Sequence, residues 1–210
     1  MGDRLRRLWD FDDLAGTESR LRTQLESESD DGGRAEVLTQ LARVQGLHED
    51  FAKGEALIVE AERLARSSAA ARIRIDLERG RLLRSGGDPA GALPLFVAAV
   101  DLATTSGEAF LAADGAHMAA LAAPDLESKL AWTLRGIEIA ESTNDRDVAY
   151  WVGPLLNNLG VAYAESGDHQ AALDAFERAL EARLLFPENR EAIRWAQESV
   201  EEERRALGRA

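Results

Sequence analysis

The stretch Leu156–Pro187, LNNLGVAYAESGDHQAALDAFERALEARLLFP, determines the expected fold of the chain. Apolar residues recur in it at helical spacing, on both sides of a central Gly167-Asp168 pair. Glycine is typical of the end of a helix and aspartate of the start of the next. Gly160 is small enough for a second helix to approach closely, with Phe176 as the large partner. The stretch therefore predicts two antiparallel helices joined by a tight turn.

The same pattern occurs 80 residues earlier in the chain without a gap. The matching residues are Gly80, Leu83, Gly87-Asp88, Ala92-Leu93, Phe96 and Ala99. A match at one fixed offset is typical of a repeat protein. The offset leaves room for two units of roughly 34 residues and about a dozen more, so we expect a divergent copy between the two.

The pattern resembles the tetratricopeptide repeat (TPR), with Leu156 where that repeat has tryptophan and Pro187 about three residues late. Segments 8–13, 77–81 and 114–118 extend the resemblance to a group of bacterial TPR proteins. It implies an all-α, right-handed α–α superhelix of about four helix-pair repeats, with capping helices at both ends. Members of the superfamily mostly bind other molecules.

The expected organisation has three parts. The first is an N-terminal capping segment with a helix, the second comprises four repeats, and the third is a C-terminal capping helix. Their limits are 1–34 for the first part, 35–68, 73–106, 110–143 and 153–186 for the repeats, and 188–210 for the last. Residues 27–33 are acidic and contain glycine, which predicts a loop. Pro124-Asp125 replaces the Gly-Asp turn in the divergent third unit.

The amino-acid composition argues against several classes of function. A net charge of −13 argues against a general nucleic-acid binder. The chain has no cysteine, which excludes disulfides and thiolate metal sites. No apolar run suggests a membrane span, and no apolar segment follows Met1, so we expect a cytoplasmic location. We expect no cofactor and no metal.

The first helix of each repeat lines the concave face of such a superhelix. Aligning the repeats on Gly160 and its equivalents selects polar and adaptable side chains that would share one groove. We predict that these residues bind the partner: Gln40, Arg43, Glu78, Arg81, Asp114, His117, Met118, Asn157 and Asn158.

Several of these residues also have structural interpretations. Arg81 and Glu78 could form a solvated pair within one helix. His117 could be packed at a tight helix contact, with Asp114 orienting its imidazole. Two adjacent asparagines have mediocre helix propensity, which favours a binding role for Asn157 and Asn158. Trp9 and Phe11 are expected to pack on the first repeat, and the N-terminal segment could fold back into the groove.

We therefore predict a non-catalytic adaptor that binds a peptide or partner protein in the groove, acting as a monomer or weak homodimer. Alanine at Arg81 or Asn158 should then abolish binding without unfolding the chain. The alternative is a cytoplasmic sensor of a small molecule or peptide signal. An Asp114–His117 catalytic dyad and self-association through an uncapped end are further possibilities.

Overall fold

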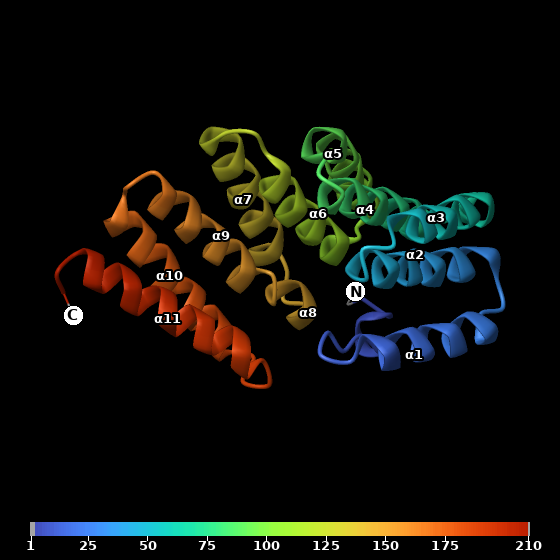
Figure 1. Ribbon diagram of the computed structural model, residues 1–210, viewed down its shortest axis with the longest axis horizontal. Coiled ribbons are helices and arrows are strands. Elements are labelled where there is room, and N and C mark those ends of the chain that lie inside the picture. Colours follow the sequence, from blue (N-terminus) through green and yellow to red (C-terminus); the bar gives the residue numbers. More distant parts are fainter. Residues whose placement is uncertain (1–2, 210) are drawn as a thin grey trace.

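The computed structural model describes residues 3–209, which contain helices and no β-strand. The elements are η1 (Arg6–Leu8), α1 (Leu14–Ser27), α2 (Asp31–Leu47), α3 (Phe51–Ala65), α4 (Ala69–Ser85), α5 (Pro89–Ser106), α6 (Ala109–Ala122), α7 (Leu126–Glu141), α8 (Arg146–Ala149), α9 (Val152–Glu165), α10 (His169–Leu184) and α11 (Arg190–Ala206). The helix pairs form an arch in which α3, α5 and α7 follow the outer side (Figure 1). Helices α2, α4, α6 and α9 follow one another along the inner side, which we call the concave face.

Four antiparallel pairs build the arch: α2 with α3, α4 with α5, α6 with α7, and α9 with α10. The chain is thus an all-α solenoid, as the repeat pattern predicted. Helix α1 covers α2 at one end, and α11 covers α10 at the other. The short helix α8 precedes the fourth pair, and Gly153-Pro154 lie in the first turn of α9.

The loop predicted for residues 27–33 is shorter than expected, because α2 already begins at Asp31. The side chain of Asp30 accepts a hydrogen bond from the backbone N–H of Gly33, which satisfies one free donor of the first turn. An N-cap aspartate therefore offsets the low helix propensity of two glycines.

The two matching repeats share their helix contacts in detail. A Cβ atom on Gly80 would lie 2.5 Å from the ring of Phe96, and one on Gly160 would lie 2.6 Å from the ring of Phe176. Each glycine therefore permits a close approach that no other residue would allow. In both repeats the next turn has a glycine with positive φ, followed by an aspartate that caps the second helix.

The core extends along the solenoid. One cluster joins α1 to α4, another joins α4 to α7, and two smaller clusters join α7 to α10 and α10 to α11. Helix α5 is 18 residues long and apolar enough to cross a membrane, contrary to the sequence-based expectation. In the solenoid it packs between α4 and α6, with Phe96 and Val100 buried.

Candidate functional site

A row of polar side chains crosses the concave face from α2 to α6. Gln40 Nε2 lies 3.4 Å from Glu78 Oε1, which also accepts a hydrogen bond from Arg81 Nη1 at 2.7 Å. Arg81 Nη2 donates to Asp114 Oδ1 at 2.5 Å. We call these four residues the polar row. The guanidinium of Arg81 thus joins Glu78 to Asp114, and Glu78 joins this pair to Gln40. The structure therefore connects predicted site residues from three consecutive repeats.

The polar row is buried. Gln40 and Glu78 are each 2% exposed and Asp114 is 4% exposed. Burial disfavours the charge of Asp114, but the guanidinium groups of Arg81 and Arg43 outweigh it and hold the pKa of this carboxyl below its ordinary value. Burial likewise opposes the charge of Arg81, and Asp114 and Glu78 raise its pKa. The charges therefore stabilise one another in a low-dielectric site.

One acceptor in the polar row is unused. Glu78 Oε2 is buried and has no hydrogen-bond partner among residues 3–209. A buried acceptor without a partner costs free energy, of the order of 1–3 kcal/mol. A donor could reach this oxygen only if the side chains around it moved, because its accessible surface is close to zero.

His117 and Asn158 extend the polar surface to α9. Asn158 Nδ2 donates to His117 Nδ1 at 3.0 Å, and the imidazole lies 5.3 Å from the ring of Trp151. Burial lowers the pKa of His117 to about 4, although Asp114 opposes the shift. The imidazole is consequently neutral at pH 7, and Asn158 keeps its amide oxygen without a partner among the described residues.

Arg43 occupies the other end of the concave face. Its guanidinium carbon lies 5.1 Å from the ring centroid of Trp9 and 5.5 Å from that of Phe11. Within residues 3–209 it makes no hydrogen bond or ion pair, and burial followed by the nearby charge of Arg81 lowers its pKa. Trp9 also donates from Nε1 to Gln40 Oε1 at 2.9 Å. Both aromatic residues therefore cover α2, as predicted.

Two predicted site residues stand apart from this arrangement. Met118 is only 8% exposed and packs in the core cluster that joins α4 to α7, so it offers a ligand little surface. Asn157 is half-buried, and its side chain makes no hydrogen bond to the rest of the described chain. The possible dyad also lacks its contact, because Asp114 bonds to Arg81 and His117 bonds to Asn158.

A cavity of about 360 Å³ opens beside Asn158, where α4, α6, α7 and α9 meet. Leu121 and Val161 contribute apolar surface to it and are 37% and 42% exposed. Arg84 contributes its guanidinium, whose only hydrogen bond within residues 3–209 is from Nε to the backbone oxygen of Leu121 at 3.4 Å. The sequence-based list omitted Arg84 and Val161. Their spacing of one turn after Arg81 and Asn158 on the same helices was the available signal.

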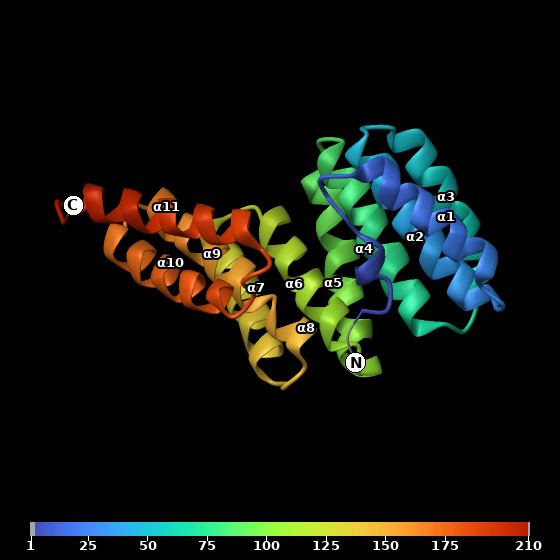
Figure 2. The same ribbon diagram turned by 90° about the horizontal axis from the view of Figure 1, so that it is seen from below.

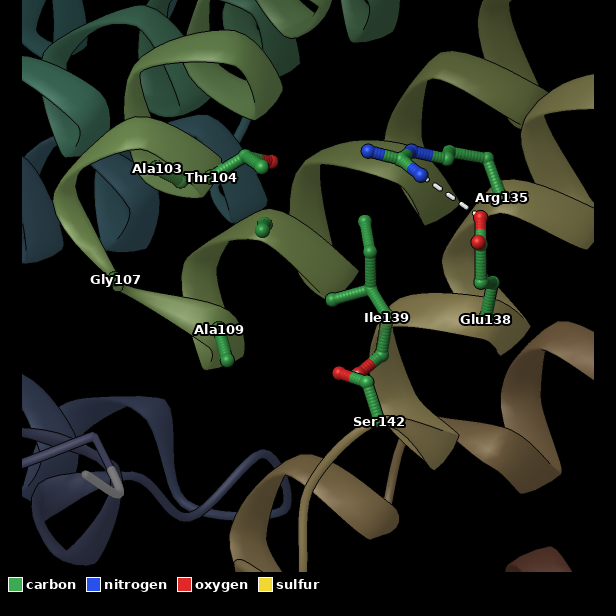
Figure 3. Close-up of a pocket in the computed structure, with 9 residues that line it drawn as sticks. Ala103, Thr104, Gly107, Ala109, Arg135, Glu138, Ile139 and Ser142 are labelled. Atoms are coloured by element: carbon green, nitrogen blue, oxygen red, sulfur yellow. Dashed lines mark hydrogen bonds and ion pairs between the residues drawn. The ribbon is translucent and has the colours of Figure 1, made fainter.

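A second cavity, of about 240 Å³, lies between the outer helices α5 and α7 and the start of α6 (Figure 3). Its wall is mostly apolar, with Ile139 and Ala109 facing the space. Among the described residues that line it, the only charged side chains are Arg135 and Glu138, which bond to each other at 2.8 Å. This cavity therefore offers a ligand fewer free polar groups than the one beside Asn158.

Residues 154–183 match the family model described as tetratricopeptide repeat. The match identifies the pair of α9 and α10 as a tetratricopeptide repeat. The match covers the fourth repeat, the one from which the fold was predicted. No curated protein shows significant similarity to the chain.

Two solved structures have a similar fold. The crystal structure of BtubC (BKLC) from P. vanneervenii aligns with a TM-score of 0.73 and 19% identity, over 99% of this chain and 85% of that one. A Rap protein complexed with Competence and Sporulation Factor aligns with a TM-score of 0.68 and 14% identity. That alignment covers 92% of this chain and 60% of the Rap protein, so the chain spans less than two thirds of its length. At these identities the likeness shows the fold alone.

Proposed function

We propose that the protein is an interaction adaptor that binds an extended peptide, or a segment of a partner protein, on its concave face. The TPR repeat supports a role in protein interaction in general. The cavity beside Asn158 favours the concave face as the binding site. We also propose that the chain acts in the cytoplasm as a monomer or weak homodimer, without nucleic acid, membrane or cofactor.

The observation that carries this proposal is the set of free groups around the cavity. Asn158 offers an unpartnered amide oxygen, and Arg84 offers the Nη donors of its guanidinium. These groups match the N–H donors and C=O acceptors of an extended backbone. Leu121 and Val161 would receive apolar side chains of the same segment.

The structure changes the choice of variants for testing this function. Arg81 neutralises two buried carboxylates, so its removal should destabilise the fold and would not report on binding alone. Arg84 and Asn158 line the cavity without holding such a pair. The double variant Arg84→Ala/Asn158→Ala is therefore the sharper test.

The test is affinity capture from native lysate with three baits of confirmed fold. The baits are the wild type, the double variant and a matched outer-face variant, Arg135→Ala/Gln170→Ala, which also removes one arginine and one amide. We expect proteins that the wild type and the outer-face variant retain and the concave-face variant loses. Loss with the outer-face variant instead would assign binding to the outer helices and overturn the proposal.

A second candidate function is a sensor of a small molecule or peptide signal bound on the same face. The Rap protein whose fold is similar was solved in complex with Competence and Sporulation Factor, which motivates this alternative. A sensor should gain melting temperature with one specific ligand, because a ligand that binds only the folded state stabilises it. A broad panel of metabolites and short peptides without a shift would count against this function.

A further inference from the structure

Residues 3–13, which we call the N-terminal segment, lie across the concave face. The segment is irregular apart from η1, and it runs from α1 toward α8 and the fourth repeat (Figure 2). Its aromatic end covers α2, where Trp9 bonds to Gln40 and stacks with Phe11 at 5.1 Å. Arg43 thereby lies beneath two rings instead of facing solvent.

The basic part of the segment reaches a residue 141 positions away in the sequence. Arg6 Nη1 lies 3.3 Å from Asp147 Oδ1 and 3.4 Å from the backbone oxygen of the same residue. The guanidinium carbon of Arg6 is 4.2 Å from the ring centroid of Tyr150, within the range of a cation–π interaction. One segment therefore connects the first repeat with α8, directly before the fourth pair.

Further contacts hold the start of the segment. Leu5 is 1% exposed in the first core cluster, and Asp3 forms a buried ion pair with Arg74. Arg4 pairs with Glu28 at 2.6 Å and with Glu36 at 3.4 Å. Arg7, in contrast, is exposed, and its side chain forms no hydrogen bond or ion pair with the described residues.

The segment is held in the way a bound peptide is held. Among the described residues, its backbone makes no hydrogen bond to the backbone of α2, α4, α6 or α9. The backbone of Leu8 and Asp10 bonds to the side chains of Arg20 and Thr17 in α1. Contacts with the concave face come from side chains of the segment. Such contacts could be replaced one by one by side chains of another chain.

We propose that the N-terminal segment is an intramolecular ligand of the concave face, which a partner segment of the same chemistry displaces. The required chemistry is an arginine followed three residues later by an aromatic residue, as in Arg6 and Trp9. Asp147 and Tyr150 bind the arginine, while Gln40 and Arg43 bind the aromatic side chain. This inference rests on the proposed function and adds to it the ligand class and a means of regulation.

Displacement has a consequence for affinity. While the segment occupies the face, an external ligand binds only the fraction of molecules in which the segment has left. Weakening the segment should therefore tighten binding of the ligand, whereas a purely structural cap would lower stability and leave affinity unchanged. This difference separates the two roles.

The experiment titrates a fluorescein-labelled synthetic peptide of residues 3–13 with the full chain and follows fluorescence anisotropy. We expect Arg6→Ala/Trp9→Ala to bind it at least about tenfold more tightly than the wild type. Arg6→Ala alone removes one half-exposed contact and should give a smaller gain in affinity for the peptide. It replaces the double variant in the test if that variant fails to fold. Arg7→Ala is the matched control and should equal the wild type, and a scrambled peptide should not bind.

Equal affinities for the wild type and both Arg6 variants would overturn the proposal, as would equal binding of the scrambled peptide or no binding to any variant. These outcomes leave the adaptor function standing, because the partner's dependence on Arg84 and Asn158 is measured separately. If a partner binds the Arg84→Ala/Asn158→Ala variant as well as the wild type, the proposed adaptor function on this face is wrong, independently of the peptide titration.

Discussion

Arg79 and Arg81 lie two positions apart on α4, and each bridges two carboxylates in opposite surroundings. Arg79 bonds to Glu55 and Glu62 of α3, whose side chains are 47% and 44% exposed. Arg81 bonds to Glu78 and Asp114 on the concave face, whose side chains are 2% and 6% exposed. The ion pairs of an arginine with two carboxylates are therefore exposed to solvent on the outer side of α4 and buried on its inner side.

This difference separates the structural groups of the concave face from the groups that are free for a ligand. Buried charges must be paired, because an unpaired ion in a low-dielectric site is costly. The guanidinium of Arg81 is paired with two carboxylates. Arg81 therefore stabilises the fold at the concave face and has few donors left for a ligand. Arg84 and Asn158, at the edge of the polar row, keep groups that a partner can use.

The largest expected effect comes from removing the two arginines in turn. Arg81→Ala leaves two buried carboxylates uncompensated and should lower the free energy of unfolding by about 3–5 kcal/mol. Arg79→Ala breaks exposed pairs and should cost less than about 1 kcal/mol. Urea unfolding of both variants measures the difference. Equal losses would show that the two sides of α4 do not differ as the burial indicates.

The next effect is a pH dependence that belongs to the concave face. The pKa of His117 is about 4 in the folded chain and about 6.5 when unfolded, so between these values the unfolded state binds more protons. Stability should therefore fall by about 3 kcal/mol more in the wild type than in His117→Gln as pH drops from about 6.5 to about 4. Unfolding free energies at several pH values measure this difference. Parallel curves would contradict a buried neutral imidazole.

The smallest effect concerns Asp76, half-buried on α4 near Arg79. Burial raises the pKa of this carboxyl, although Arg79 and Arg72 oppose the shift, so folding disfavours its charged form. Asp76→Asn should therefore raise the free energy of unfolding at pH 7, by less than the two changes above. The gain should vanish at pH 3, where the carboxyl is protonated in both states. A loss of stability at pH 7 would show that the charge is needed by its arginine neighbours.

The helix pairs could be predicted from the sequence because local chemistry determines them. Gly160 and Phe176, and their equivalents 80 residues earlier, encode a helix contact through size alone. The start of α2 was missed because an Asp30 cap outweighs two glycines. Helix α5 exceeds the expected apolar length because it packs between two other helices.

The sequence predicted most residues of the candidate site but not the contacts among them. Alignment of the repeats selected Glu78, Arg81 and Asp114, but only the fold shows that they bond to one another across two helices. Met118 follows His117 in the sequence and yet faces the core, because the turn of the helix carries it away from the groove. The contact of Arg6 with Asp147 depends on the curvature of the whole solenoid, which no local pattern encodes.

The affinity of a captured partner tests the central claim, that the concave face is the binding face, most directly. We would measure Kd for the wild type, Arg84→Ala/Asn158→Ala and Arg135→Ala/Gln170→Ala. The account predicts at least about a tenfold weaker Kd for the concave-face variant, equivalent to about 1.4 kcal/mol, and no more than about a twofold change for the outer-face variant. A tenfold loss confined to the outer-face variant would contradict it.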